Sequence, residues 1–559
     1  MTRFRLDSFA PLVFLLAAAT YGCEASLSDG DPIDAALAGI DPNALQAHVT
    51  LLADDRLAGR RTGTPGYALA TEYVGAQFAE IGLRPVGDGE SYLGRVGLRR
   101  STALVEASTM TLLANGSVEP LTAGVDYVAG ARSDQAQGST EAPAVFVGFG
   151  VSAPRLGYDD YEGVEVRGKI VVVLRGSPAS LAGDASAHYS SGRIKNQAAA
   201  GKGAVGIVTV LPPTDERRGS WESAVSSAGR GRTQWLGPDG APPREAALET
   251  AMMSPEGGAK LFTNVAETFA DVLSASDAGR PGSFDLGIDL RITSRTEHSN
   301  LDGFNVMGLL PGSDPSLAGE YVIVTAHLDH VGVGRAQDGD SIYNGAADNA
   351  AGVGSLIEVA RALSGLPIPP RRAVLFVATT AEEEGLIGAH YLAANPITSL
   401  GTLIANINMD GNLMLYPMAD IIAVGGEHTS LGAVVEAAAN RVGLKRQPDP
   451  MPEQNLFVRS DHYAFVLQGI PSVALMSGPT SSDPSIDGTT VLNDWIATTL
   501  HRPGDDANQS FDYESGADYV RTAFLVAEHV ANAEDPPRWI EGDFFGENLG
   551  SAESLGRDR

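Results

Sequence analysis

Residues that could bind a metal ion or move a proton recur along the second half of the chain. In chain order they are His327, Asp348, Glu382, Glu383, Asp410 and His501. Two imidazoles and several carboxylates form a ligand set that borderline metals such as Zn²⁺ accept. His327 ends the apolar run YVIVTAH, Glu382 and Glu383 lie close after a second such run, and Asp410 directly follows a third, whereas Asp348 and His501 lie in loops. This pattern indicates a metal-dependent reaction.

Taken singly, each of these residues has an ordinary structural explanation. A histidine at a strand end is often a hydrogen-bonded core residue, and three successive glutamates are often a solvated turn. Asp348 precedes a helical pattern, where it could serve as an N-cap. One capping aspartate explains one position, however, and does not explain a set of ligands at successive strand ends. We therefore favour a metal site.

The elements that must position these residues alternate between strand and helix. Strands are expected at 321–326, 373–379, 403–409 and 471–476, and helices near 350–364, 385–394, 430–442 and 516–532. Such alternation predicts an α/β sandwich with a mostly parallel sheet. In such folds the chemistry lies at the carboxyl ends of the strands.

The segment 126–290 has a different character, because short β-like runs alternate with Gly- and Ser-rich stretches. The stretch GVEVRGK partly matches a phosphate loop, but Ile170 replaces the Ser or Thr that would hold Mg²⁺, and a strand pattern follows. The runs VRGKIVVVLRG and, from Lys195, KNQAAAGKGAVGIVTV resemble a protease-associated (PA) domain. We expect an accessory β-rich domain that carries no catalytic group.

Residues from about 300 to 530 resemble the M28 family of co-catalytic zinc peptidases. The resemblance rests on HLD at 327–329, DNAAG from Asp348, the Glu382–Glu383 pair, Asp410, His501, RSDHYAF at 459–465 and GIPSVAL at 469–475. It implies a three-layer α/β/α zinc-peptidase sandwich with a mostly parallel central sheet and an inserted PA domain. It also implies peptides as substrates.

The resemblance further implies a role for each residue. It implies two zinc ions per chain, bridged by Asp348. His327 and Asp410 would complete one metal site, and Glu383 and His501 the other. Glu382 would be the general base that acts on a metal-activated water, and Asp329 would orient His327. In RSDHYAF, Asp461 and His462 are expected to line the substrate site.

The function expected from this resemblance is a di-zinc exopeptidase that hydrolyses the N-terminal peptide bond. Alternatives on the same fold are a carboxypeptidase, a glutaminyl-cyclase-like enzyme and a non-catalytic receptor-like protein. The expected ligands and Glu382 leave a near-neutral centre, which Glu384 or Asp461 would make negative. A negative rim favours an α-ammonium group, whereas Arg459 could instead pair with an α-carboxylate.

The amino terminus resembles an export signal, with Arg3 and Arg5 before the short apolar stretch Phe9–Thr20. Cys23, the only cysteine, follows it. A lipoprotein acylated at Cys23 is expected, in the periplasm or cell envelope, with ordinary cleavage and secretion as the alternative. The lipid would then be the one membrane attachment.

The expected organisation is a signal peptide at 1–23, the N-terminal part of the peptidase domain at 24–125, a PA domain at 126–290, the zinc peptidase domain at 295–535 and a flexible tail at 536–559. The chain has 559 residues, with 69 acidic and 39 basic side chains and a net charge of −30. Such a balance argues against nucleic acid as a partner, since phosphates require a basic face. A G-x-S-x-G motif is absent from the sequence, which disfavours a serine hydrolase.

Overall fold

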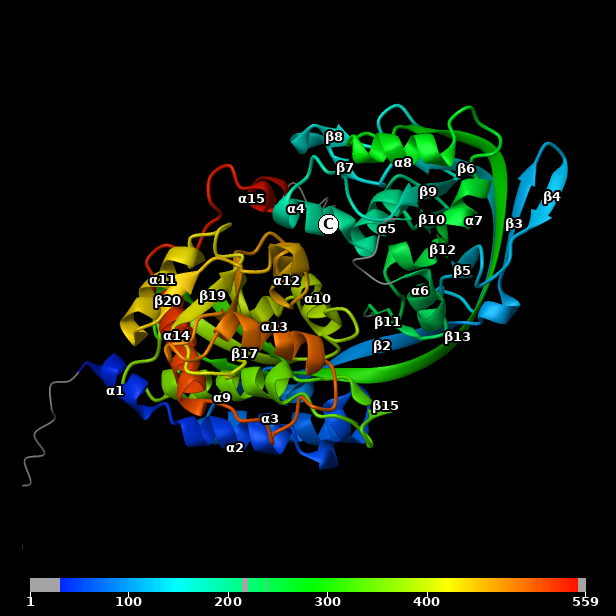
Figure 1. Ribbon diagram of the computed structural model, residues 1–559. Coiled ribbons are helices and arrows are strands. Elements are labelled where there is room, and N and C mark those ends of the chain that lie inside the picture. The colour runs from blue at the N-terminus through cyan, green and yellow to red at the C-terminus, as the bar shows by residue number, and fades with distance from the viewer. Residues whose placement is uncertain (1–30, 214–219, 238, 551–559) are drawn as a thin grey trace, which may run out of the picture.

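The computed structural model describes residues 31–213, 220–237 and 239–550. They form a larger lobe and a smaller β-rich lobe, which the long strand β13 (Ser283–Leu310) connects (Figure 1). The expected export signal and Cys23 lie outside the described residues. Among the described residues, no helix has both the length and the apolar character needed to cross a membrane.

Four parallel strands form the centre of the larger lobe. They are β14 (Glu320–His327), β17 (Ala373–Thr379), β18 (Thr402–Met409) and β21 (Ser472–Ser477). β14 lies between β17 and β18, and β18 pairs with β21. All four coincide with predicted strands to within a residue at each end. The flanking strands are β1 (Arg84–Pro85), β2 (Leu93–Ala103), β11 (Arg232–Trp235), the second half of β13, β19 (Asp420–Val424) and β20 (Lys445–Gln447).

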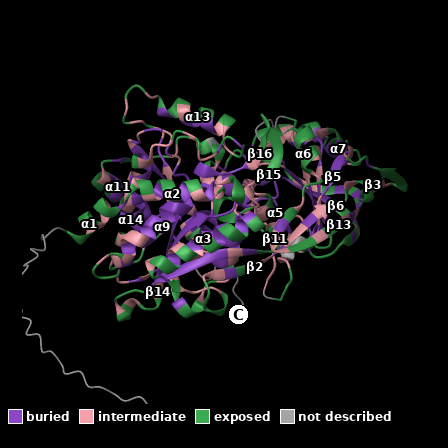
Figure 2. Cartoon of the chain, turned by 90° about the horizontal axis from the view of Figure 1, so that it is seen from below, coloured by how far each residue is buried: buried purple, intermediate pink, exposed green. Residues whose placement is uncertain are grey.

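Helices cover both faces of this sheet. Alternate side chains of a strand point to opposite faces, and on β14 Val322 and Val324 enter one apolar cluster while Tyr321 and Ile323 enter another. The first cluster includes side chains of α2 (Pro42–Leu52), α3 (Pro65–Ile81), α9 (Ala351–Ser364), α11 (Leu431–Val442) and α14 (Tyr513–Asn532); the second includes those of α10 (Ile387–Ala394) and α12 (His462–Val466). Figure 2 shows β14 in the colour of buried residues, in agreement with its burial along nearly its whole length. This is the predicted three-layer α/β/α sandwich.

Local sequence sets the ends of α3. Thr64 caps the helix by accepting a hydrogen bond from the Tyr67 backbone N–H, and Pro65 occupies its first position. Gly82 closes the helix in the left-handed conformation, with φ 87°. These residues mark both ends of the helix, because proline suits the first turn and glycine the C-cap.

The smaller lobe has its own sheet and apolar core. Its strands are β3 (Thr109–Ala114), β4 (Ser117–Pro120), β5 (Tyr127–Ala129), β6 (Gln137–Val147), β9 (Ile170–Leu174), β10 (Gly206–Val210), β12 (Glu249–Met253) and the first half of β13. Its helices are α4 (Gly183–Ser190), α5 (Gly192–Gly201), α6 (Trp221–Ser227), α7 (Pro255–Lys260) and α8 (Phe269–Asp277). The lobe therefore begins before residue 126, because β3 pairs with β13. Its assignment as a PA domain stays a prediction.

Residues 536–550 are ordered and do not form part of the flexible tail that was expected at 536–559. Residues 536–550 pack on the larger lobe and include α15 (Phe544–Leu549). Phe545 is only 1% exposed, and the Trp539 indole N–H donates to the Gly469 carbonyl over 3.0 Å. Burial of these aromatic side chains offsets the entropy lost on ordering the segment.

His428 connects the two lobes and this C-terminal segment. Its Nε2 lies 2.9 Å from Oδ2 of Asp184 in α4, and its Nδ1 lies 2.6 Å from Oδ2 of Asp543, the N-cap of α15. Glu427 is the adjacent acidic side chain, and the three groups Asp184, Glu427 and His428 lie close together. We refer to His428, Asp184, Asp543 and Glu427 as the interlobe cluster.

Candidate metal centre and active site

The parallel sheet brings the predicted site residues together at one edge. His327 is the last residue of β14, Glu382 and Glu383 follow β17, and Asp410 follows β18. Asp348 lies in the turn before α9. Because neighbouring parallel strands end at the same edge of a sheet, these side chains meet there.

Asp348 lies at the middle of the group. Its Oδ1 is 3.1 Å from His327 Nε2, and its Oδ2 is 2.9 Å from His501 Nε2. His327 Nε2 is also 3.4 Å from Asp410 Oδ1, and His501 Nε2 is 3.2 Å from Glu383 Oε2. The other four predicted ligands thus lie around the Asp348 carboxylate, and we call these five residues, together with Glu382, the catalytic cluster.

Burial and mutual charge perturb the acid–base groups strongly. Burial alone would raise the pKa of Asp348, but hydrogen bonds from His327 and His501 outweigh it and hold that pKa well below its usual range. Burial, reinforced by the charges of Glu383 and Asp410, raises the pKa of Glu382 well above its usual range. One carboxyl group therefore favours the charged form and its neighbour favours the protonated form.

Two further residues hold the catalytic cluster in place. The Ser460 hydroxyl donates to Asp410 Oδ2 over 2.5 Å. Asp505 accepts hydrogen bonds from the backbone N–H groups of Ala347 and Asp348, over 2.9 and 3.0 Å. Neither residue was predicted, although Asp505 follows His501 closely in the motif HRPGDD.

The donor set suits metal ions. Within the described residues, His327, Asp348 and Asp410 offer one group of ligand atoms within 4.8 Å of one another, and His330, Asp348 and Glu383 offer a second. Glu383 Oε1 is buried and has no aligned hydrogen-bond partner among the described residues, although His330 Nδ1 lies 2.6 Å from it. Carboxylates brought this close repel one another, and a divalent cation between them relieves that repulsion. Mixed imidazole and carboxylate ligands are those of zinc sites.

Comparison with known proteins decides the family. Residues 305–526 match the family model described as Peptidase family M28. This segment is an M28 peptidase domain. The match contains all five predicted ligands and Glu382.

Individual relatives agree with that assignment. Probable leucine aminopeptidase 2 of Aspergillus oryzae is 27% identical over 200 residues, and that of Aspergillus fumigatus is 26% identical over 199 residues. Each alignment covers 34% of this chain but only 37% and 36% of the relatives, so the chain spans little more than a third of their length. A solved aminopeptidase from Aneurinibacillus sp. strain AM-1 shares the fold, with a TM-score of 0.50 and 18% identity over 90% of this chain and 97% of that one.

Asp329 of the M28 domain acts differently from the expected role. Its backbone carbonyl, not its carboxylate, lies 3.1 Å from His327 Nδ1. The carboxylate instead accepts from the backbone N–H of Glu382 over 3.0 Å and of Glu383 over 3.4 Å. The reason is geometric, because the turn after β17 places these N–H groups over the carboxylate. Asp329 therefore fixes the turn that carries Glu382 and Glu383.

Glu384 does not add free negative charge to the M28 site. Arg61 Nε lies 3.2 Å from its Oε1, Arg100 also binds that oxygen, and the Thr233 hydroxyl donates to Oε2. The expectation that Glu384 makes the rim negative is therefore wrong, since two guanidinium groups balance its charge. Arg459, the cation considered in the sequence, makes a 3.4 Å contact with the Gln454 carbonyl.

Asp461 and His462 lie beneath the M28 site. They are 1% and 0% exposed. Asp461 accepts a hydrogen bond from the Thr379 hydroxyl, and burial raises its pKa to about 6. Burial lowers the pKa of His462 to about 4. Their expected contact with substrate stays a prediction, and both are enclosed by protein in this structure.

His330 is a further residue of the M28 domain that the sequence analysis did not single out. It is 1% exposed, and its Nδ1 lies 2.6 Å from Glu383 Oε1. Its position in the motif HLDH, three residues after His327, is the feature of the sequence that could have indicated that it lies at the site.

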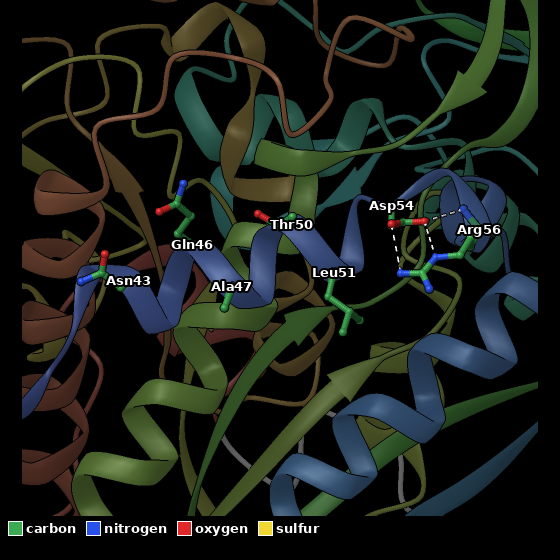
Figure 3. A pocket seen from close by; sticks show the side chains of 7 residues that line it. All are labelled: Asn43, Gln46, Ala47, Thr50, Leu51, Asp54 and Arg56. Carbon is green, nitrogen blue, oxygen red and sulfur yellow. Dashed lines mark hydrogen bonds and ion pairs between the residues drawn. The ribbon is translucent and has the colours of Figure 1, made fainter.

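A shallow depression elsewhere on the surface carries none of this chemistry. It measures about 470 Å³ and lies along α2, lined by Asn43, Gln46, Ala47, Thr50, Leu51, Asp54 and Arg56 (Figure 3). Its two charged groups, Asp54 and Arg56, pair with each other over 2.8 Å. We therefore place the active site at the catalytic cluster and not at this depression.

Proposed function

We propose that this protein is a di-zinc exopeptidase that hydrolyses the amino-terminal peptide bond of peptides. The observation that carries the proposal is the position of Asp348 between His327 and His501, with the half-buried Glu382 beside them. His327, Asp410 and Asp348 would hold one zinc ion. Glu383, His501 and Asp348 would hold the other. When bound, zinc supplies Lewis-acid polarisation of the scissile carbonyl and of the attacking water.

Glu382 is the proposed general base. In its ionised form, the Glu382 carboxylate would take a proton from water and return it to the leaving amine. Asp329 supports this role, because it binds the backbone N–H of Glu382 and so limits where the carboxylate can move. Ser460 in the same way limits the orientation of Asp410.

The amino-terminal direction of cleavage is supported by the relatives and not by the charge of the rim. The two aligned fungal relatives are named probable leucine aminopeptidases. Neither Glu384 nor Asp461 makes the rim of the site negative. Glu384 pairs with two arginines, and Asp461 is buried.

One peptide in two blocked forms tests the direction. We expect cleavage of the C-terminally amidated peptide and no cleavage of the N-acetylated peptide, because an aminopeptidase requires a free α-ammonium group. Released amino acids are measured by chromatography, with and without a strong chelator. Cleavage of the acetylated form alone would indicate a carboxypeptidase, and chelator-resistant activity would contradict the use of zinc.

We also propose export to the cell envelope through the N-terminal signal, with Cys23 as the lipid attachment point. Replacing Cys23 by Ala should move the protein from the membrane fraction to the soluble fraction. An unchanged distribution between the two fractions would rule out the lipid anchor.

A further inference from the structure

His330 lies inside the metal centre but has no role in the proposed mechanism. Its ring is buried, and neither ring nitrogen has an aligned hydrogen-bond partner among the described residues. Burying an imidazole in this way costs free energy unless a nearby charge compensates. The compensating group is Glu383, whose Oε1 lies 2.6 Å from Nδ1.

The backbone makes room for this ring. Gly345 has φ 64°, and a Cβ atom built there would lie 2.5 Å from His330 Cγ and 2.2 Å from the Asp348 carbonyl oxygen. Only glycine fits so close an approach. The same backbone turn that leads to Asp348 therefore packs directly against His330.

Interatomic distances indicate that His330 is not itself a metal ligand. Two atoms bound to one tetrahedral zinc at about 2.0–2.1 Å lie about 3.3 Å apart. The contacts of His327 and His501 with the carboxylates, 2.9–3.4 Å, approach that value. The 2.6 Å separation of His330 and Glu383 is too short for two ligands of one ion, and it is close to the length of a charge-assisted contact.

A ligand role would also conflict with catalysis. Asp348, Glu383 and His501 already provide three protein ligands, and catalytic zinc sites keep a further position open. A fourth protein ligand from His330 would fill that position.

We infer that His330 is a positioning residue that holds Glu383 Oε1, so that Oε2 faces His501 and Asp348 and can bind metal. The inference rests on the metal centre of the proposed function. Groups that orient a metal ligand in this way typically contribute 10–100-fold to metal affinity. We expect His330 to contribute by that amount to the ion that Glu383 binds.

The test measures zinc binding to the full-length, chelator-stripped protein by competition with a chromogenic chelator. His330→Leu should weaken one of two zinc sites about 10–100-fold while two ions still bind at saturating zinc. His330→Gln should recover part of the affinity, because its amide N–H can contact Glu383. In a Glu383→Gln background, His330→Leu should cause no further loss, since the two residues act as one unit.

His390→Leu is the matched control, because His390 is also buried in the larger lobe and lies outside the catalytic cluster. It should leave zinc affinity unchanged. Unchanged affinity in His330→Leu would overturn the inference, and so would a stoichiometry of one ion at saturating zinc, which would make His330 a ligand. Zinc binding that depends on His330 in a protein without peptidase activity would overturn the proposed function alone. No zinc binding by the unmodified protein would overturn both.

Discussion

Two groups of histidine and carboxylate side chains in this molecule look alike in composition and differ in environment. The catalytic cluster surrounds Asp348 with two imidazoles and further carboxylates. The interlobe cluster surrounds the single imidazole of His428 with Asp184, Asp543 and Glu427.

Hydrogen-bond satisfaction distinguishes the two clusters. Both ring nitrogens of His428 are engaged by carboxylates, at 2.6 and 2.9 Å. Burial would lower the pKa of His428, but these two carboxylates outweigh it and raise the pKa to about 9. Because both ring nitrogens already face carboxylates from two other parts of the chain, we interpret this cluster as an ion pair between the lobes. In the catalytic cluster, Glu383 Oε1 and both nitrogens of His330 lack aligned partners among the described residues.

The largest effect is expected when the central carboxylate of the catalytic cluster is removed, which tests whether only this cluster binds metal. Asp348→Ala should lose bound zinc, and peptidase activity should fall to background, because both proposed metal sites use this side chain. His428→Gln, in the interlobe cluster, should keep its zinc. Elemental analysis after dialysis gives the metal content of both variants. If both variants lost zinc equally, or if neither lost it, the proposed difference in metal binding between the two clusters would be wrong.

A smaller effect is expected from a substitution that removes proton transfer but leaves metal binding in the catalytic cluster unchanged. Glu382→Gln should reduce kcat by about 10²–10⁴-fold, the usual contribution of a general base. Its zinc content should equal that of the unmodified protein, since glutamine keeps the shape but cannot take a proton. Steady-state kinetics and metal analysis on the same sample provide the check. Release of zinc would make Glu382 a ligand instead of a base.

The smallest effect concerns stability in the interlobe cluster. The pKa of His428 is raised from 6.5 to about 9 in the folded protein. Its stabilisation is therefore fully present below pH 6.5 and is lost as the pH rises through about 9. His428→Gln should reduce the free energy of unfolding by about 1–3 kcal/mol at pH 6, and by much less at pH 9.5.

Urea unfolding at both pH values measures this difference. A loss that is the same at pH 6 and pH 9.5 would contradict the ion pair. Metal binding at the catalytic cluster should respond in the opposite sense, because ligands must lose their protons before they bind. A rise in pH should therefore weaken the ion pair of the interlobe cluster and strengthen metal binding at the catalytic cluster.

Much of the larger lobe was predictable because its signals are local. Apolar runs gave the four parallel strands, and Thr64, Pro65 and Gly82 gave both ends of α3. The β-rich lobe was less predictable at its start, since β3 belongs to it only through pairing with the distant strand β13. The ordered C-terminal segment was missed for a similar reason, because its aromatic side chains are buried by another part of the chain.

The sequence by itself determined which residues end the strands, and parallel pairing then brought them together at one edge of the sheet. Only the tertiary structure decided which charges remain free. Arg100 and Glu384 are 284 positions apart, and His428 and Asp184 are 244 apart. The contact between His330 and Glu383 also depends on how two separate turns pack. A side chain's charge, burial and partners depend on neighbours in space, and a linear sequence does not specify those neighbours.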